Sequence, residues 1–386
     1  MSTIQTNAIV DASGGNTASV NGVTPNTHSV RGRNLIINGA MQVAQRGTTV
    51  TIANTGAHSS PDRFRIQHNA NTTSTVSQVS DVPDSTNFKY SLKFTNGAGE
   101  TRNGSDYARL YTRLEGNDIH HLKLGTSSAK GFTLQFWVKS SLTGTFGVGF
   151  TGSDSASNGV YSSSYTISSA NTWEYKTVTV PAATITSGTW TDTNGVGISI
   201  HWDLGEGPTR SNSVGWQAGD SPGHMGLSGG VKLVETTGAT LNLTGVKLEE
   251  GLIATEYDHR PYEEELATCQ RYYYQIGGAS MGGDGFSYLA HGFADTTTRA
   301  IHLIHFPQEM RTAPTFICSQ TTSGFYWRAP IGNPTSPTAT ALPTLGGSSK
   351  VWGRVDCTGS GFSAGTGCFF QQNNSVNTFI AFQAEL

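Results

Sequence analysis

The chain has 386 residues, which is enough for two domains with substantial hydrophobic cores. Charged residues supply 13% of it, against about 25% in typical soluble domains. The net charge is −3, and no run of Lys or Arg is interleaved with aromatic residues. Nucleic acid is therefore not an expected partner. No apolar stretch reaches the roughly 18 residues that a membrane helix needs, so we expect no membrane insertion.

Glycine supplies 47 residues, and Ser, Thr and Asn are abundant. This composition favours short strands joined by tight turns, because Gly adopts positive φ and small polar side chains bond back to the turn backbone. The first residues lack the basic flank and apolar core of a signal peptide, which predicts synthesis in a cytoplasm. The four cysteines are expected to be free thiols: Cys269, Cys318, Cys357 and Cys368.

The first 32 residues are predicted to form an extended attachment segment. Ile4, Thr6, Ala8 and Val10 alternate with polar neighbours, and a turn-forming run follows them. A segment of this kind has too little apolar surface to fold alone. We therefore expect residues 1–32 to attach to another chain.

Period-two alternation of apolar residues dominates residues 33–262, and this is the pattern of half-buried strands. Clear examples lie at residues 88–94, 132–138 and 196–202, each bounded by Gly, Asn or Ser. Many short strands with frequent turn residues predict an all-β fold, here a jelly-roll-like β-sandwich.

A β-bulge is predicted at Gly245. Leu241 and Leu243 lie in one phase of the alternation, whereas Val246 and Leu248 lie in the other. One extra residue in the strand would bring both pairs to the core.

A linking helix is predicted over residues 263–275, with Pro261 in its first turn and acids near the positive end of its dipole. Leu266, Cys269 and Tyr273 fall on one stripe of this helix. The stripe can pack within the chain or against equivalent helices of neighbouring subunits, and we favour the first.

Residues 276–386 are expected to form a second, smaller β-sandwich. Strands are indicated from Ala300 to Phe306 and from Thr378 to Leu386. Alternate residues of the last strand share one apolar face, so the C-terminus is predicted to be built into a sheet.

An ordered set of short phrases spans residues 33–275. Its members are Arg33–Gly39, Ala40–Thr48, Pro61–Phe64, Gly245–Gly251, Ala254–Tyr257, Arg260–Pro261 and Cys269–Tyr273. In this order they resemble a β-sandwich module of bacteriophage tail fibres and related virion proteins, similar in architecture to carbohydrate-binding jelly rolls. Phe306–Pro314 and the final Ala384–Leu386 also resemble endings of phage fibre proteins.

The resemblance implies a structural component of a phage virion, a tail fibre assembled in the host bacterial cytoplasm. It implies a homotrimer in which residues 1–32 attach to adaptor or nozzle proteins of the tail. Residues 276–386 would then form the tip that binds a glycan or protein on the host cell. A head fibre or capsid decoration protein is the alternative, because it needs the same anchor and tip. A glycan-degrading fibre enzyme is a second alternative.

Motifs typical of enzymes lack their required structural context. Gly226–Gly230 and Gly361–Gly365 match the G-x-S-x-G pattern of serine hydrolases. Ser228 is followed by the strand-like Val231–Val234, however, where that motif requires a helix. Gly147–Gly152 matches a dinucleotide pattern but runs on without a helix. We predict no catalytic residues and no enzymatic activity.

No cofactor is predicted from the sequence. His302 and His305 lie on opposite faces of one predicted strand and cannot both ligate one metal ion. Structural calcium stays open, because sugar-binding jelly rolls often hold it and Asp81, Asp84 and Glu249 are available acids. No ligand set is assigned.

Aromatic residues in polar, glycine-rich surroundings are the remaining functional signal. Sugars lay their apolar faces on such rings while their hydroxyls bond nearby polar groups. Alternatively, each ring covers a sheet end or a seam between subunits. The candidate glycan-binding residues are Trp190, Trp216, Phe325, Tyr326, Trp327 and Arg328.

Overall fold

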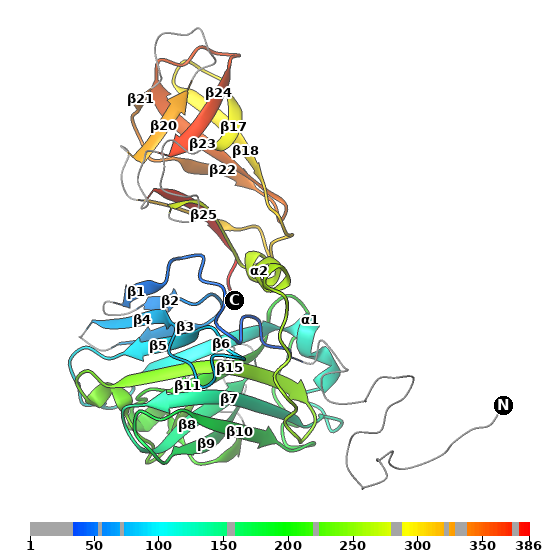
Figure 1. Ribbon diagram of the computed structural model, residues 1–386. Coiled ribbons are helices and arrows are strands. Elements are labelled where there is room, and N and C mark those ends of the chain that lie inside the picture. Colours follow the sequence, from blue (N-terminus) through cyan, green and yellow to red (C-terminus); the bar gives the residue numbers. More distant parts are fainter. Residues whose placement is uncertain are drawn as a thin grey trace, which may run out of the picture.

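The computed structural model describes residues 34–386 apart from 53–55, 70–72, 153–158, 219–223, 279–287, 320–323, 329–337 and 373–377. The expected attachment segment, with Ile4, Thr6, Ala8 and Val10, lies outside the described residues. Figure 1 shows two β units stacked end to end, with helix α2 (Tyr262–Gln270) between them. The fold is all-β, as predicted.

The larger unit is a sandwich of two sheets. Across the first sheet lie, in order, β1 (Thr49–Ile52), β4 (Ser74–Val79), β5 (Ser91–Thr95), β15 (Thr240–Glu250), β7 (Phe132–Ser140) and β10 (Glu174–Val180). Across the second lie β13 (Gly215–Gln217), β9 (Val160–Ile167), β8 (Gly144–Thr151), β11 (Val196–Asp203), β6 (Ala108–Glu115), β3 (Arg65–His68) and β2 (Gly56–Ser59). The strands in both sheets pair antiparallel.

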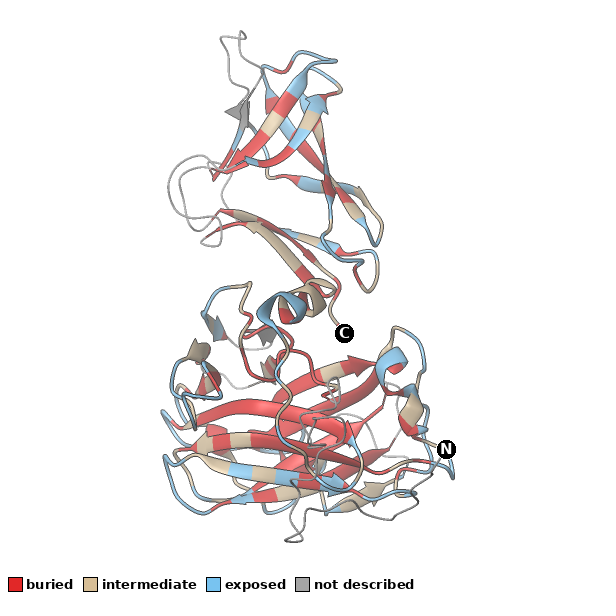
Figure 2. Cartoon of the chain, turned by 45° about the vertical axis from the view of Figure 1, so that its right-hand side comes forward, coloured by how far each residue is buried: buried red, intermediate tan, exposed pale blue. Residues whose placement is uncertain are grey.

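Alternate side chains of the two sheets fill the core between them. In β7, Phe132, Leu134 and Phe136 are fully buried, and Figure 2 shows the buried band that such positions form. Phe136 meets Trp202 of the facing sheet edge-on, with ring centroids 5.7 Å apart. Truncating Phe136 to Ala would leave a cavity and lower the free energy of unfolding by about 3–5 kcal/mol.

The predicted bulge at Gly245 is confirmed. The pairing of β15 with β7 shifts register between Thr244 and Lys247. Gly245 has a φ of 62°, in the left-handed region that favours glycine. Leu243 and Val246 on either side are both fully buried, so the extra residue restores the inward phase of the strand.

Short elements connect the strands of the sandwich. They are α1 (Gly116–Ile119), η2 (His120–Leu122), η3 (Pro208–Arg210), β12 (Ser211–Asn212), β14 (Gly226–Leu227) and η4 (Leu233–Glu235). The strand-like conformation expected at Val231–Val234 was wrong. Leu233 and Val234 are neighbours and both are buried; a strand would send them to opposite faces, whereas the tight 3₁₀ turn η4 places both against the core.

The linking helix is shorter than predicted. Helix α2 ends at Gln270, and Tyr273–Gly277 form strand β16 instead of a last helical turn. Strand β16 pairs along its whole length with β25 (Phe379–Gln383). This long-range pairing outweighs the local helical signal, and the second β unit therefore begins at Tyr273.

The C-terminal domain also has two sheets. One contains β16, β25 and β19 (Thr315–Cys318). The other contains, in order, β20 (Phe325–Arg328), β24 (Gly367–Gln372), β17 (Tyr288–Ala294), β18 (Arg299–His305), β23 (Trp352–Ser360) and β21 (Thr338–Ala339), with β22 (Thr344–Ser348) also paired to β23. Val355, Phe370 and Phe382 share one core between the sheets. Strand β25 is central in its sheet, which confirms that the C-terminal strand is built into the fold.

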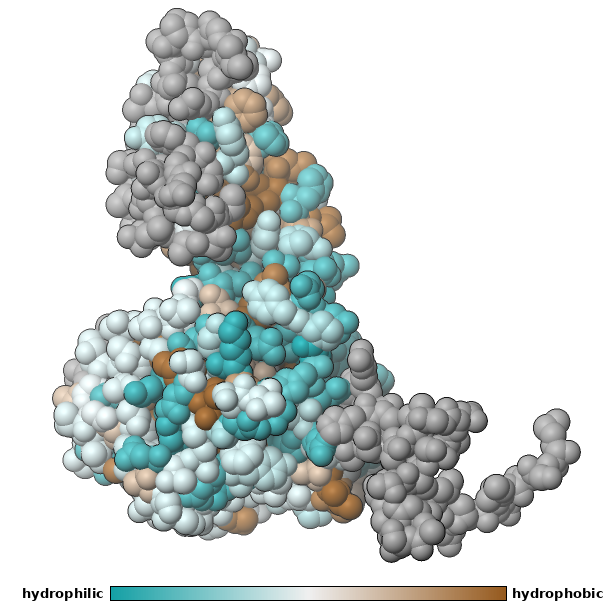
Figure 3. Space-filling model, viewed as in Figure 1, coloured by the Kyte–Doolittle hydropathy of each residue, from teal (hydrophilic) through white to brown (hydrophobic). Residues whose placement is uncertain are grey.

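The surface reflects the low charge of the sequence. In Figure 3 most of the sandwich is pale or teal, with small separate hydrophobic patches, while brown areas gather on the C-terminal domain. Phe293 and Leu303 of that domain are about half exposed. All four cysteines are free thiols. No helix among the described residues is long and apolar enough to span a membrane.

Candidate functional site

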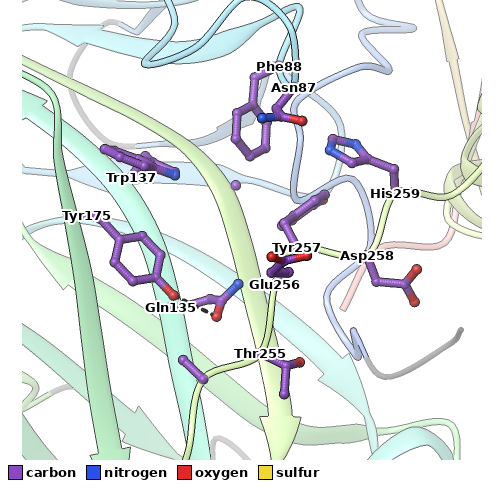
Figure 4. Close-up of a pocket in the computed structure, with 12 residues that line it drawn as sticks. Asn87, Phe88, Gln135, Trp137, Tyr175, Thr255, Glu256, Tyr257, Asp258 and His259 are labelled. Carbon is purple, nitrogen blue, oxygen red and sulfur yellow. Dashed lines mark hydrogen bonds between the residues drawn. The ribbon is translucent and has the colours of Figure 1, made fainter. Parts of the chain in front are cut away.

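A cavity of about 840 Å³ opens on the outer face of the first sheet of the sandwich. Strands β7, β10 and β15 contribute to it, together with the loop before β5 and the segment after β15 (Figure 4). The lining residues are Asn87, Phe88, Gln135, Trp137, Tyr175, Gly245, Ala254, Thr255, Glu256, Tyr257, Asp258 and His259. We refer to this cavity as the pocket.

One wall of the pocket comes from the sheet itself. Gln135 and Trp137 point outward from β7 because they alternate with the buried Leu134 and Phe136. Tyr175 pairs with Trp137 across β10 and β7, and their ring centroids lie 5.4 Å apart. The Tyr175 hydroxyl donates to Gln135 Oε1 at 2.8 Å, which fixes both side chains. The wall thus presents two rings and an amide to the cavity.

The opposite wall consists of Phe88, Tyr257 and His259. The Phe88 ring lies 5.3 Å from that of Tyr257 and 5.4 Å from that of His259. Burial raises the pKa of the Tyr257 hydroxyl well above its usual range. Burial also lowers the pKa of His259 below 6.5, so its ring is neutral at pH 7 and can both donate and accept hydrogen bonds.

Gly245 lies on the floor between the two walls. A Cβ at this position would stand 2.9 Å from Phe88 Cζ and 3.1 Å from Trp137 Cδ1. The bulge therefore has two effects. It returns the apolar side chains of β15 to the core, and the absence of a side chain at Gly245 lets a ligand approach the backbone.

Residues 251–260, which we call the strap, cross the outer face of the sheet and carry Tyr257. Two buried charged residues of β15 hold the strap down. Lys247 Nζ donates to Thr255 Oγ1 at 2.5 Å and to the Glu256 carbonyl at 2.8 Å. Glu249 accepts hydrogen bonds from the Thr255 amide and hydroxyl, each at 2.7 Å. Lys247 and Glu249 also pair with each other at 3.2 Å, so neither buried charge is left uncompensated.

Five of the seven phrases described above meet elsewhere, in the contact region between the two β units. We call this region the neck, and it is formed by residues 34–47, 61–64, 260–273 and 384–386. Leu266 packs against a small apolar cluster in the neck that contains Ile37, Val43, Cys269, Tyr272 and Leu386. Leu266 and Cys269, two residues of the predicted stripe, thus pack within the chain, whereas Tyr273 lies in strand β16.

Asparagines near the start of the described chain organise the neck. Asn34 Oδ1 accepts from the amides of Ile36 at 2.9 Å and Leu248 at 3.2 Å. Asn38 adopts a left-handed φ of 59°, and its side-chain amide donates to the carbonyls of Val43 at 2.8 Å and Asp62 at 2.9 Å. Asparagine suits both needs, since it tolerates this φ and bonds nearby backbone.

A buried ion-pair network joins the last residues of the chain to the sandwich. Arg63 donates to Glu385 Oε2, and its guanidinium carbon lies 3.4 Å from the centre of the Tyr272 ring. Arg46 Nη2 bonds Glu385 Oε1 at 2.9 Å. Burial alone would raise the pKa of Glu385, but Arg63, Arg46 and Arg65 together hold it below its usual value. Glu385 is thus charged in the folded protein.

Asp62 behaves in the opposite way to Glu385. Burial raises the pKa of Asp62 to about 6, and the nearby charge of Glu385 adds to this rise. Part of this rise in pKa is offset by Arg46, which lies 3.6 Å from the Asp62 carboxylate. Hydrogen bonds from the Gln45 amide at 3.1 Å and from its side chain at 2.6 Å also lower the pKa. Asp62 therefore gains a proton in mildly acidic solution.

A second ion pair ties helix α2 to the sandwich. Arg271 Nε and Nη2 donate to the two oxygens of Glu115 at 2.7 and 2.8 Å, and the Tyr272 hydroxyl donates to the same carboxylate at 2.6 Å. Arg311 donates to the carbonyls of Ala384 and Glu385, both at 2.7 Å. The phrases that lie in the neck thus form part of a packed junction between the two units.

Two of the predicted glycan-binding residues, Trp190 and Trp216, both bond to Ser187. Their indole N–H groups donate to its carbonyl at 3.0 Å and its hydroxyl at 3.2 Å. Both rings are half-buried and pack against the main core of the sandwich. Neither ring lines the pocket.

The predicted cluster in β20 does not form one surface. Phe325 is 2% exposed and packs on Phe370 in the core, so the expectation that it contacts a ligand was wrong. Tyr326, the next residue along the strand, points to the other face and is 40% exposed. The side chains of Trp327 and Arg328 lie outside the described part of the chain.

The enzyme-like motifs stand in strands and turns. Gly147 and Gly149 lie within β8, where a phosphate-binding motif would turn from a strand into a helix. Ser228 follows β14 and precedes the three-residue η4, and Ser363 connects β23 to β24. Neither serine has the strand-to-helix elbow of a hydrolase nucleophile.

The acids considered for calcium are separated and bound within the chain. Asp81 pairs with Lys139 and accepts from Trp173 Nε1 at 3.1 Å, while Asp84 accepts from the Thr86 amide at 2.9 Å. Among the described residues, no group of three or more His, Cys, Asp or Glu could hold a metal ion. His302 is buried and His305 exposed, on opposite faces as predicted.

The pocket residues were missed at the level of sequence, although two signals were present. In the alternating pattern of β7, Trp137 falls between the buried Phe136 and Val138, so its side chain points to the outer face of the sheet. Tyr257 ends the phrase Ala254–Tyr257, which carried the resemblance but was given no role of its own.

No family model matches the chain, and no curated protein matches it in sequence. Among solved structures, it is similar to the enzymatically active domain of tailspike protein 4 of bacteriophage CBA120, at 13% identity and a TM-score of 0.30, over 57% of this chain and 22% of that one. It is also similar to TmCBM61 in complex with β-1,4-galactotriose, at 14% identity and a TM-score of 0.28, over 57% of this chain and 100% of that one. A putative sugar-binding protein from Bacteroides thetaiotaomicron matches at 13% identity and a TM-score of 0.32, over 56% of this chain and all of that one.

Proposed function

We propose that this protein is a saccharide-binding component of a phage virion, with the pocket as its saccharide site. The observation that carries the proposal is the pair of aromatic walls, Trp137 with Tyr175 and Phe88 with Tyr257, on either side of an open floor. Sugar rings offer apolar faces to such walls. Gln135 and the other polar lining groups provide hydrogen-bond partners for sugar hydroxyls.

The pocket has the features of a preformed binding site. Its volume falls within the roughly 300–1,000 Å³ of small-ligand sites. The Tyr175 to Gln135 hydrogen bond and the tethered strap hold both walls in place without a ligand. Little ordering would be required on binding, which favours affinity.

The virion role is supported by the phrases that resemble phage fibre modules. Five of these phrases lie in the neck, and a packed neck suits a subunit that links the tail to the host surface. In this proposal the protein is a homotrimeric tail fibre, residues 1–32 attach it to the tail, and the remainder reaches the host surface. Gold-labelled antibodies against the purified chain should decorate phage tails. Labelling of the capsid would instead identify the protein as a head fibre. Phage particles without label would refute the virion role.

The saccharide site is tested by screening the full chain on an array of bacterial and plant oligosaccharides. We expect Trp137→Ala to weaken binding to any captured saccharide by about tenfold or more, as for a ring at the centre of a contact surface. Tyr262→Ala is the matched control, because Tyr262 is half exposed but lies on α2 outside the pocket. Equal binding by both variants would place the site elsewhere, and a folded chain that captures no saccharide would refute the proposal.

A further inference from the structure

One wall of the pocket is connected to the neck. Tyr257 lines the pocket with its ring, while its hydroxyl lies beside Gly39 of the neck, since a Cβ on Gly39 would stand 3.0 Å from the hydroxyl oxygen. This hydroxyl is hydrogen-bonded to the side chain of Asn34, which also belongs to the neck. Tyr257 therefore contacts the pocket with its ring and the neck with its hydroxyl.

The Asn34 side chain is itself held in one orientation. Asn34 is buried, and its Oδ1 accepts hydrogen bonds from the amides of Ile36 and Leu248. Its Nδ2 donates to the Val246 carbonyl at 3.2 Å. These three bonds to the backbone fix the plane of the amide group. The group that bonds the Tyr257 hydroxyl is thus in place before any ligand arrives.

The end of the strap has a second connection to the neck. Arg260 donates through Nη1 to the Ile36 carbonyl at 3.0 Å and through Nη2 to the Asn34 carbonyl. Its Nη1 also lies 3.3 Å from Glu265 Oε1 of helix α2. Glu265 in turn accepts from the Asn38 amide at 2.5 Å. The neck therefore holds this part of the strap at two points.

The contacts of the Tyr257 ring within the wall are less directional than its hydroxyl bond. The ring meets Phe88 and His259 edge-on, with centroid distances of 5.3 and 4.7 Å. Aromatic pairs attract one another over a range of offsets, whereas a hydrogen bond weakens steeply when it is bent or stretched. The bond to Asn34 is therefore the contact that fixes where the ring stands opposite Trp137.

Building on the saccharide site proposed above, we infer that Asn34 is a positioning residue for saccharide binding, because it holds the Tyr257 ring in the place where a sugar packs against it. The neck then has a second role besides joining the two β units. A ring that is fixed in advance loses little freedom when the sugar binds, which favours affinity.

The test compares Tyr257→Phe with Tyr272→Phe in the full chain. The titrations use the oligosaccharide that the wild type captures most tightly from the array of bacterial and plant oligosaccharides. Tyr257→Phe keeps the ring but removes its bond to Asn34, so affinity should fall about three- to tenfold. Tyr272→Phe removes another hydroxyl bond of the neck, to Glu115 at 2.6 Å, at a residue outside the pocket. Its affinity should stay within about twofold of the wild type.

A double-mutant cycle separates positioning from direct contact with the sugar. If Asn34 acts through the Tyr257 hydroxyl, Asn34→Ala should weaken binding, and adding Tyr257→Phe to it should cause no further loss. Losses that multiply in the double variant would show that the hydroxyl contacts the sugar itself, which would overturn the inference. Thermal unfolding verifies that each variant is folded during titration. If Asn34→Ala does not fold, the comparison of Tyr257→Phe with Tyr272→Phe still decides.

Failure of this inference is distinguishable from failure of the proposed function. If Trp137→Ala abolishes binding while Tyr257→Phe binds as tightly as the wild type, the saccharide site stands and the role of Asn34 is wrong. Equal losses in Tyr257→Phe and Tyr272→Phe would also overturn the inference, because affinity would then follow the stability of the neck as a whole. If the folded chain captures no saccharide, the proposed function fails and the inference fails with it.

Discussion

The neck and the pocket use similar residues in opposite ways. In the neck, the buried Arg63 contacts both the Tyr272 ring and the Glu385 carboxylate, whose side chain is also buried. In the pocket, Trp137 and Tyr257 line an open cavity. Each ring packs against another aromatic ring, Tyr175 for Trp137 and Phe88 for Tyr257. The neck is thus built to fix two units together, whereas the pocket is built to remain available. The phrases that make the chain resemble phage fibres mainly mark the neck, while most of the proposed binding residues lie between them.

The largest effect is expected from breaking the neck. Arg63→Met removes one of the two arginines that bond the buried Glu385 carboxylate, together with its contact with the Tyr272 ring. This change should lower the free energy of unfolding by about 3–5 kcal/mol. Urea denaturation of the full chain measures this change.

Arg299→Ala is the control for that experiment. It breaks the Arg299–Asp295 pair, which lies on the surface, and should change the unfolding midpoint little. Similar midpoints for the two variants would contradict the structural role assigned to the neck.

The second effect concerns pH and Asp62. The pKa of Asp62 is about 6 in the fold against an ordinary value of 3.8, so the folded state holds a proton that the unfolded state has already released. Its stabilising contribution is complete below about pH 4 and is lost as the pH rises through about 6. The free energy of unfolding of the wild type should therefore fall by roughly 2–3 kcal/mol between these values, relative to Asp62→Asn. Parallel pH profiles for the two proteins would show that Asp62 titrates normally.

A smaller effect on stability, coupled to a loss of binding, is expected at the bulge. Gly245→Ala would force a left-handed φ on alanine, at a cost of about 1–2 kcal/mol, and would push its Cβ toward Phe88 and Trp137. The added Cβ should push the walls of the pocket apart. Saccharide affinity should therefore fall even under conditions in which the variant is fully folded.

Gly238→Ala is matched to that variant. Gly238 has a similar φ of 68°, but an added Cβ would meet no atom within 4 Å. We expect a comparable loss of stability with unchanged affinity. Loss of affinity in both variants would mean that the effect at Gly245 is not local to the pocket.

Local patterns were sufficient to predict the bulge at Gly245, the inward face of β7 and the apolar stripe of α2 that carries Leu266 and Cys269. Each depends on the spacing of apolar residues within one element. The end of α2 could not be predicted in the same way, because Tyr273 leaves the helix to pair with Gln383 more than a hundred residues later. Long-range pairing of this kind leaves no local signal.

The pocket could not be predicted for the same physical reason. Phe88, Trp137, Tyr175 and Tyr257 come from four separate segments, and only the strand register brings them together. The sequence pointed instead to tryptophans in glycine-rich loops. The indole groups of Trp190 and Trp216 are both bonded to Ser187, and their rings pack on the core.

The most direct test is to compare Trp137→Ala with Trp190→Ala in one titration, using a saccharide captured by the wild-type chain. Both variants remove an indole from the sandwich, one in the pocket and one at the loop predicted from the sequence. We expect affinity to fall by about tenfold or more for Trp137→Ala and to stay within about twofold for Trp190→Ala. Loss of affinity in Trp190→Ala with unchanged affinity in Trp137→Ala would contradict the assignment of the pocket as the saccharide site.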